Sequence, residues 1–279
     1  MNWSCIDTTL EIGRRPLVMG ILNVTPDSFS DGGRFAGAEE AAERARQMIR
    51  EGADIVDVGG ESTRPGAAEV SEEEEIRRTI PVVEAIRGEA SAVISIDTRK
   101  AAVARRAIEA GAIIINDVSA LTHDAEMAGV VAGSGAGIVL MHMQGSPRTM
   151  QQDPRYEDVV VDVRDYLGGR LEACLDAGIA AGQAVLDPGI GFGKTLDHNL
   201  ALLEGISSLR GLGRPVMIGL SRKSFLGRLT GRDTGDRSSA TLAGNFFAAM
   251  RGADILRVHD VRDTVDAMTV FEAVQAWND

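Results

Sequence analysis

The chain has 279 residues, with 41 acidic against 29 basic side chains and a formal net charge of −12 at pH 7. This charge argues against nucleic acid as a partner, because affinity for nucleic acid comes from neutralising phosphates, and the 4% of aromatic residues offer few surfaces for base stacking. No apolar run approaches the roughly 18 residues of a membrane span, and two cysteines cannot form a disulfide framework. We therefore expect a cytoplasmic protein with no nucleic-acid partner and no membrane partner.

Eight short apolar runs, rich in Val and Ile, are spread along the chain, and a helical pattern follows each of them. Runs without polar alternation are typical of parallel strands that are buried on both faces. In chain order, the predicted strands are Leu17–Leu22, Asp54–Val58, Ala92–Ile96, Ile113–Ile115, Gly137–Met141, Ala184–Leu186, Pro215–Leu220 and Ala253–Val258. The predicted helices are Glu39–Glu51, Glu72–Arg87, Lys100–Ala110, Asp124–Ala132, Tyr156–Ala177, Leu196–Leu203, Ser238–Arg251 and Val261–Trp277.

Eight β-then-α units predict an α/β protein with a single (β/α)8 TIM barrel that occupies residues 1–279 as one domain. An open doubly wound sheet is the alternative, although such sheets seldom contain eight regular units. Residues Trp3–Arg14 precede the first strand and alternate weakly, which predicts a short hairpin that closes the bottom of the barrel.

The second helix carries its own start signal. Ser71 followed by Glu74 predicts a capping box. We interpret the acidic run Glu72–Glu75 as a solvated first turn that complements the helix dipole, rather than as a metal site.

Polar residues follow every predicted strand, and barrel enzymes place their chemistry at the carboxyl ends of the strands. One such residue could simply cap a helix, but eight in register are poorly explained that way. In chain order they are Asn23, Glu61-Ser62-Thr63-Arg64, Asp97, Asn116-Asp117, His142, Asp187, Ser221-Arg222-Lys223, and Arg257 with His259.

Charge divides these residues into two groups. Arg64, Lys223, Arg257 and His259 form a cationic cluster in an otherwise acidic protein, which indicates a phosphate, pyrophosphate or carboxylate ligand. The other group, made of two carboxylates and an amide, can recognise a flat, nitrogen-rich heterocycle by paired hydrogen bonds; its members are Asp97, Asn116 and Asp187. The residues that offer oxygens to Mg²⁺, which would bridge to phosphate, are Asn23, Asp27 and Asp31.

The glycine-rich segment Gly189–Thr195 looks like a nucleotide phosphate loop, but Pro188 stands where that pattern needs its first glycine. We interpret the segment as a tight loop whose backbone approaches a ligand, with Thr195 capping the next helix. Neither a zinc-ligand pattern of histidines nor a nucleophilic serine elbow occurs in the chain.

Several loop segments, taken together and in order, resemble the dihydropteroate synthase family from about residue 15 to the C-terminus. They are Gly20–Gly33, Gly59–Gly66, Ser95–Thr98, Ile115–Asp117, Met141–Gly145, Leu186–Lys194, Ser221–Phe225 and Arg257–Asp260. The resemblance implies a (β/α)8 barrel that joins 6-hydroxymethyl-7,8-dihydropterin pyrophosphate to p-aminobenzoate, giving 7,8-dihydropteroate and pyrophosphate. It also implies that sulfonamides compete for the p-aminobenzoate site.

The resemblance further implies a role for each matched residue. Asp97, Lys223, Arg257 and His259 are the expected catalytic residues. The pterin would be held by Asp97, Asn116, Asp187 and Lys223 and lined by Met141, Phe192 and Gly219. The pyrophosphate would be bound by Asn23, Arg64, Arg257 and His259, with Asn23 also binding Mg²⁺. The p-aminobenzoate would be surrounded by Phe29, Thr63, Pro65, Lys223 and Ser224.

We expect a dissociative substitution, in which the cationic cluster stabilises the departing pyrophosphate and Asp97 stabilises positive charge on the pterin. The segments Asp27–Gly37 and Thr63–Glu69 contain Gly and Pro and are expected to close over the reaction. A pterin-dependent methyltransferase and an inactive pterin-binding paralogue are the alternatives. The cationic cluster argues against the first, and the retained loop residues argue against the second.

A homodimer is the expected assembly, because members of the resembled family commonly pair through outer helices. Phe246 and Phe247 are adjacent on the helix Ser238–Arg251 and cannot both point into one core, so one of them is a candidate interface residue. On the same helix, Ser239-Ala240-Thr241 departs from the family pattern, which raises a question about local packing rather than about activity.

Overall fold

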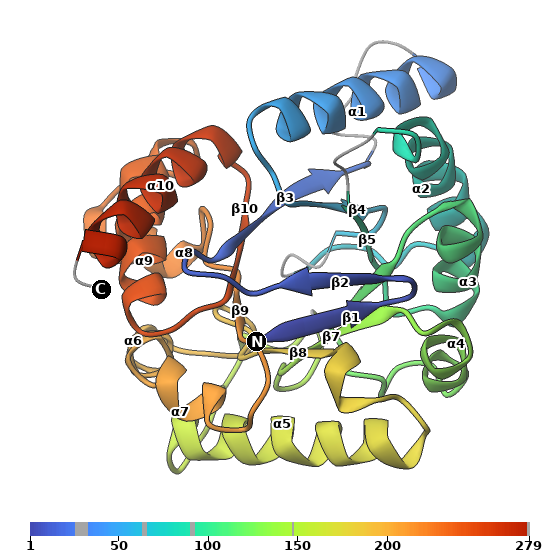
Figure 1. The fold of residues 1–279 in the computed structure, drawn as a ribbon. Helices are drawn as coiled ribbons and strands as arrows, with labels where there is room; N and C mark the ends of the chain where they lie inside the picture. The colour runs from blue at the N-terminus through green and yellow to red at the C-terminus, as the bar shows by residue number, and fades with distance from the viewer. Residues whose placement is uncertain (26–32, 63–65, 90–92, 147, 278–279) are drawn as a thin grey trace.

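Eight parallel strands form one sheet in the order β8-β7-β6-β5-β4-β3-β10-β9. An isolated bridge between Leu186 and Val216 joins the two ends of this order, so the sheet closes into a barrel surrounded by helices (Figure 1). The (β/α)8 barrel predicted from the sequence is therefore confirmed. The computed structural model describes residues 1–25, 33–62, 66–89, 93–146 and 148–277.

The barrel strands lie close to the predicted apolar runs. Only β9 is much shorter than its run Pro215–Leu220: at its start Pro215 has no N–H to donate, and the Val216 N–H donates to the Asp254 side chain at 3.0 Å. The strands are β3 (Leu17–Asn23), β4 (Ile55–Gly59), β5 (Val93–Asp97), β6 (Ile114–Asp117), β7 (Gly137–Met141), β8 (Ala184–Asp187), β9 (Met217–Ile218) and β10 (Ile255–Val258).

The helices match the predicted ones, with two additions and one large shift. The first helix begins at Gly33 rather than Glu39, because Gly33 and Gly37 are poor helix formers that conceal its first turns. The additions, α7 and α8, are too short to give a periodic pattern. The helices are α1 (Gly33–Arg50), α2 (Glu72–Ile86), α3 (Ala101–Ala110), α4 (Met127–Ser134), α5 (Val159–Asp176), α6 (Leu196–Glu204), α7 (Ile206–Arg210), α8 (Ser224–Thr230), α9 (Ser238–Met250) and α10 (Val261–Trp277). None of them, within the described part of the chain, has the length and apolarity that a membrane crossing needs.

An N-terminal hairpin of β1 (Asn2–Cys5) and β2 (Thr8–Glu11) lies across one end of the barrel (Figure 1). The Trp3 side chain is fully buried, and its indole N–H donates to the Gln183 carbonyl at 2.7 Å. The apolar side chains that pack with Trp3 are Cys5, Met19, Ile55, Ile114, Val139, Val185, Met217 and Ile255. These residues come mostly from the amino-terminal halves of the strands, so the predicted closure of the bottom of the barrel is confirmed.

The start of α2 differs in part from the prediction. Ser71 caps the helix, since its Oγ accepts a hydrogen bond from Glu74 N at 3.3 Å. The reciprocal half of the capping box does not form, because the Glu74 carboxylate pairs with two arginines of the same helix. The interpretation of the acidic run as solvated is wrong for Glu75, whose side chain is fully buried against Lys100.

Candidate active site at the carboxyl ends of the strands

The register of the parallel strands brings the polar residues at the strand ends to one level. Asn23 is the Cα partner of Gly59, Gly59 is the partner of Asp97, and Asp97 is the partner of Asn116. Neighbouring β-strands lie about 4.8 Å apart, so these residues lie side by side at the ends of four adjacent strands. The predicted gathering of polar strand ends is thus observed for Asn23, Asp97 and Asn116.

A chain of hydrogen bonds crosses the mouth of the barrel through Arg257 on β10. Its Nε donates to Asp57 Oδ2 at 2.7 Å, and its Nη2 donates to Asp97 Oδ2 at 2.7 Å. Asn116 Nδ2 donates to the same Asp57 oxygen at 2.9 Å. Four side chains from four strands thus fix one another, which is the preorganisation that a reaction with developing charge requires.

Burial shifts the ionisation of this group. The pKa of Asp97 is raised because burial disfavours its charged form and the nearby Asp57 adds repulsion, although Arg257 opposes both effects. Burial alone would lower the pKa of Arg257, but Asp57 and Asp97 together raise it above its ordinary value. Arg257 therefore stays charged and is the cation that allows two carboxylates to lie side by side in the barrel.

Lys223 reaches the same mouth from the N-terminal end of α8. Its ammonium donates to the Ile190 carbonyl and lies 4.4 Å from the centre of the Phe192 ring. Burial lowers the pKa of Lys223 to about 7, against the attraction of Asp187. A lysine in this position can donate hydrogen bonds to a polar ring edge while its ammonium lies over the Phe192 ring.

The glycine-rich segment is a tight loop, as predicted. All three glycines have a positive φ, between 63° and 82°. A Cβ on Gly189 would lie 1.9 Å from the His142 carbonyl oxygen, one on Gly191 would lie 2.9 Å from the Lys223 stem, and one on Gly193 would lie 2.8 Å from a backbone oxygen. Side chains at these positions would push the loop off its neighbours, so glycine is required by both space and backbone conformation. Thr195 caps α6, also as predicted, since its Oγ1 accepts from His198 N at 3.2 Å.

The buried side chain of Lys194 holds this loop in place. Its buried ammonium donates to the Phe192 carbonyl at 2.9 Å and lies 3.0 Å from His142 Nδ1. Burial lowers the pKa of Lys194 to about 7, and burial together with Lys194 lowers the pKa of His142 to about 3. The neutral imidazole therefore accepts the lysine proton in its hydrogen bond, and the pair holds the carbonyl that precedes Gly193.

The depressed pKa of Lys194 gives a pH-dependent stability. Between the folded pKa near 7 and the ordinary lysine pKa of 10.5, the native Lys194 is neutral while the unfolded one is charged, so the unfolded state binds more protons and stability rises with pH. We expect the free energy of unfolding of the unmodified chain to rise by about 1 to 2 kcal/mol relative to Lys194→Met between pH 7 and pH 9. Urea unfolding of both proteins across this range measures the difference. A difference that does not change with pH would contradict it.

Four further predicted residues, Asp187, His259, Met141 and Gly219, lie at the ends of barrel strands or directly after them. Asp187 is buried beside the loop and accepts from Gly189 N at 2.7 Å, and burial raises its pKa. His259 Nδ1 lies 3.0 Å from Ser221 Oγ, so Ser221 orients the imidazole. Met141, the Cα partner of Asp187, is buried, and Gly219 lies against the Arg257 stem. Ser224 is exposed at the first position of α8. The predicted residues that lie outside the described part of the chain are Asp27, Phe29, Asp31, Thr63, Arg64 and Pro65.

The described residues can hold a magnesium ion only with help from a ligand. Asn23 ends β3 half-buried, and its side chain makes no hydrogen bond to the described part of the chain, so its amide oxygen is available. No cluster of three or more His, Cys, Asp or Glu side chains suited to a metal occurs among these residues. Mg²⁺ commonly takes one or two protein oxygens and completes its shell with phosphate and water. The donor set therefore fits a magnesium ion that arrives with pyrophosphate.

The sequence profile of the pterin binding enzymes matches residues 19–259. Dihydropteroate synthase of Escherichia coli strain K12 is 50% identical over 266 residues, which are 95% of this chain and 94% of the relative. The chain belongs to the dihydropteroate synthase family. The enzyme of Haemophilus influenzae is a further member, at 45% identity over 98% of this chain and 97% of its own length.

Solved structures of dihydropteroate synthases share the whole fold. The Yersinia pestis enzyme, solved in a sulfonamide drug complex, aligns with a TM-score of 0.93 at 46% identity, covering 99% of this chain and 100% of that one. The Xanthomonas albilineans enzyme in complex with 7,8-dihydropteroate aligns with a TM-score of 0.89 at 44% identity, covering 99% of both chains. The barrel of this synthase family is thus the barrel observed here.

Two residues that support the site, Asp57 and Thr241, are not among the site residues predicted from the sequence. Asp57 was missed because it lies inside β4, two residues before the strand ends, and only strand ends were searched. A carboxylate within an otherwise apolar buried strand was the signal that could have revealed it. Thr241, at the point that departs from the family pattern, is buried, and its hydroxyl accepts from Arg222 N at 3.1 Å. It therefore supports the strand end that carries Lys223.

Proposed function

We propose that this chain condenses 6-hydroxymethyl-7,8-dihydropterin pyrophosphate with p-aminobenzoate at the mouth of its barrel, releasing 7,8-dihydropteroate and pyrophosphate. The observation that carries the proposal is the row of buried side chains Asp57, Asp97 and Asn116, in which Arg257 bonds both carboxylates and Asn116 bonds Asp57. It offers acceptors and donors for a nitrogen-rich ring next to a cation for an anionic leaving group. The Xanthomonas albilineans synthase, whose complex contains 7,8-dihydropteroate, supports the same product.

In this proposal the pterin lies against the row and the glycine loop. Asp97, Asn116, Asp187 and Lys223 hydrogen-bond its polar edges, because two carboxylates accept while the ammonium donates and the amide does both. The pocket is lined by Met141, Phe192 and Gly219. Because Gly219 has no side chain, the ring can approach the backbone closely at this position.

The pyrophosphate would be bound by Arg257 and His259, together with Arg64 from the second loop. Arg257 uses one N–H on Nε and one on Nη2 for its two carboxylates, which leaves part of its five-donor fork for phosphate oxygens. Ser221 holds His259 in place. Asn23 would contribute an oxygen to Mg²⁺, which neutralises charge on a bound pyrophosphate.

The reaction proceeds by dissociative substitution. The bond between the pterin methylene carbon and the pyrophosphate oxygen breaks, and its electron pair leaves with pyrophosphate beside Arg257 and His259. The methylene and ring become positively charged, and Asp97 stabilises that charge from a fixed position. The amine nitrogen of p-aminobenzoate then forms the new bond and gives its proton to solvent.

The p-aminobenzoate would lie beside the opening, between the first two loops and the start of α8. Lys223 and Ser224 are the described residues assigned to it, and the exposed Ser224 lies where an incoming substrate can reach it. Phe29, Thr63 and Pro65 complete the proposed set.

Release of pyrophosphate from the dihydropterin pyrophosphate tests the proposal. We expect release that needs both p-aminobenzoate and Mg²⁺, with 7,8-dihydropteroate formed in equal amount. Tight pterin binding without release would instead support an inactive paralogue. Methyl transfer from a methylated pterin to a corrinoid protein would support the methyltransferase alternative.

We also propose that the protein is a homodimer through α9 and α10. Phe246 packs edge-on against Phe271, which joins the two helices, with ring centres 5.7 Å apart. Both helices also expose apolar side chains: Phe247 and Met250 of α9 and Trp277 of α10 are 39%, 65% and 90% exposed. Removing such side chains from water is a favourable basis for self-association.

Sedimentation at micromolar concentration is expected to show a dimer. Met250→Asp should raise its dissociation constant at least about tenfold, because burying an unpaired carboxylate at an interface costs more than 1.4 kcal/mol. The matched control is Leu175→Asp, at an exposed apolar position on α5 (50% exposed), which should leave the dimer unchanged. A monomer of the unmodified chain would contradict the proposal.

The cellular location is a proposal as well. Cys5 and Cys174 are both buried and unpaired, and burial raises the pKa of Cys174 to about 11, so neither thiol is poised for disulfide formation. We place the protein in the reducing cytoplasm.

A further inference from the structure

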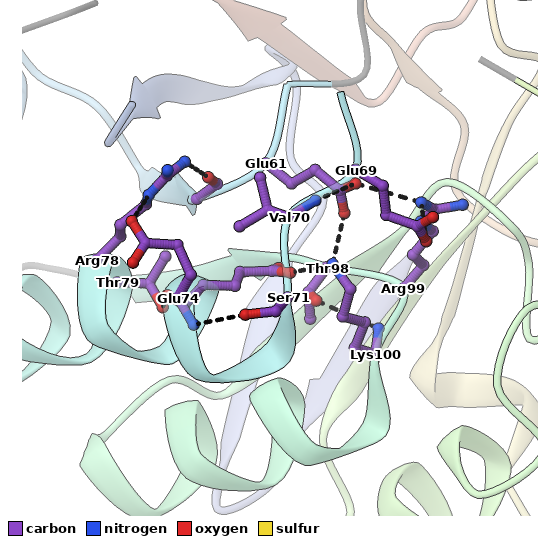
Figure 2. Close-up of polar contacts among 12 residues, drawn as sticks. Glu61, Glu69, Val70, Ser71, Glu74, Arg78, Thr79, Thr98, Arg99 and Lys100 are labelled. Atoms are coloured by element: carbon purple, nitrogen blue, oxygen red, sulfur yellow. Dashed lines mark hydrogen bonds and ion pairs between the residues drawn. The ribbon is translucent and has the colours of Figure 1, made fainter. Parts of the chain in front are cut away.

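The ammonium of Lys100 is buried between two carboxylates beside the second loop. Its Nζ donates to Glu61 Oε2 at 2.6 Å (Figure 2) and to Glu75 Oε2 at 2.5 Å. Lys100 is 6% exposed and Glu75 is completely buried. Burying such charges costs desolvation free energy, and replacing a buried ion cluster by apolar residues is often neutral for stability. Stability alone is therefore a poor explanation for the cluster.

Glu61 connects both ends of the segment that it begins. Its Oε1 accepts from the backbone N–H of Val70 at 3.4 Å and from Arg99 Nη2 at 3.2 Å. The same Arg99 nitrogen donates to Glu69 at 3.0 Å (Figure 2). The start and the end of segment 61–70 are thus tied to each other through one carboxylate and one guanidinium.

The cluster also connects this segment to the reaction centre. Lys100 and Arg99 follow Asp97 directly after the end of β5. On the other side, Arg78 of α2 donates to the Gly60 carbonyl at 2.9 Å (Figure 2). The positions of Glu61 and of the stretch 69–70 relative to Asp97 are therefore set by side chains that lie behind the mouth of the barrel.

Position 100 carries a lysine in a chain whose basic residues are mostly arginine. Only three of the 29 Lys and Arg residues in the chain are Lys, and all three follow barrel strands. Lys100 places a single nitrogen within 2.6 Å of two carboxylates. A compact ammonium can do this, whereas the broad planar fork of arginine presents its donors in a fixed spread. Position 100 therefore requires a compact ammonium group, and a positive charge alone is not sufficient.

We propose that Lys100 is a positioning residue for the p-aminobenzoate half of the reaction. It holds Glu61 close to Glu75 and the end of β5, and thereby fixes Glu61 and Val70, the two described ends of the second loop, beside which the second substrate would bind. It contacts neither substrate itself. This inference rests on the proposed function, which places p-aminobenzoate beside the second loop.

The test measures the two substrates separately in Lys100→Met. We expect the KM for p-aminobenzoate to rise about tenfold or more, since small displacements of positioning groups have effects of this size. The dissociation constant of the dihydropterin, measured by calorimetry, should change less than about twofold, because the pterin row does not include Lys100. The matched control is Arg105→Gln, which removes an exposed cation of α3 whose partner is Glu126, and it should change neither constant.

If Lys100→Met does not fold, Glu61→Gln tests the same inference. This substitution keeps the shape of the side chain at position 61 and weakens its hydrogen bond to Lys100. An unchanged KM for p-aminobenzoate in the folded variant would overturn the inference. An equal rise in the pterin dissociation constant would also overturn it, since that pattern indicates general structural damage. Failure of the unmodified chain to form dihydropteroate would instead refute the proposed function.

Discussion

Replacing Asp97 by Asn is expected to lower kcat by about 10²- to 10³-fold, the size of effect seen when one preorganised electrostatic group is removed from an active site. The amide keeps the shape of the carboxyl and an oxygen for Arg257, but it cannot stabilise positive charge on the pterin. The fold should survive, because burial already disfavours the charged form of Asp97 and Asp57 still pairs with Arg257. Steady-state kinetics and thermal unfolding measure the two effects.

Asp117→Asn is the matched control for this prediction. Asp117 is also buried, on the next strand, but its carboxylate accepts from Ser119 and from the Leu121 N–H and does not contact the row. Its replacement should cost about 1–3 kcal/mol of stability, because one acceptor of the turn is lost, while turnover stays near its original value. Nearly unchanged turnover in Asp97→Asn would remove Asp97 from the mechanism.

The barrel was predictable from the sequence because its strands are buried on both faces. Such strands leave continuous apolar runs, and the polar residue that follows each run marks the carboxyl end. Asp97, Asn116 and Asp187 were found in this way. Asp97 and Asp187 are the last residues of their strands, and Asn116 is the last but one. The local sequence pattern therefore predicts both the fold and the part of the site that lies at the ends of the strands.

The supporting contacts could not be predicted, because they join residues that are distant in sequence. Arg257 lies 200 positions after Asp57, and Lys100 lies 25 positions after Glu75. In one dimension Glu75 looks like its exposed neighbours in an acidic helical turn, and only the packing of α2 against α3 buries it. Burial and pairing of a charge are properties of tertiary structure, and no local period records them.

Replacing Arg257 by Gln is expected to lower the free energy of unfolding by about 3 to 5 kcal/mol at pH 7.5, since it leaves two buried carboxylates without their cation. It should also lower kcat by about 10²-fold or more, because charge on the departing pyrophosphate loses a fixed donor. Urea unfolding and the rate of pyrophosphate release measure these effects. Arg257→Lys should recover part of the stability but little activity, because a single ammonium cannot bond both Asp57 and Asp97 as the guanidinium does.

The pH dependence separates loss of charge from loss of packing in Arg257→Gln. Without the guanidinium, the already raised pKa of Asp97 should rise further, because Arg257 is the group that lowers it. A carboxyl whose folded pKa is above its unfolded value destabilises the native state when it is ionised, so stability returns as pH falls through the folded pKa. The variant should therefore approach the unmodified chain in stability between pH 7.5 and pH 5.5. A deficit that stays constant over this range would show that the cost comes from the lost packing of the Arg257 stem against Gly219, and not from the unpaired carboxylates.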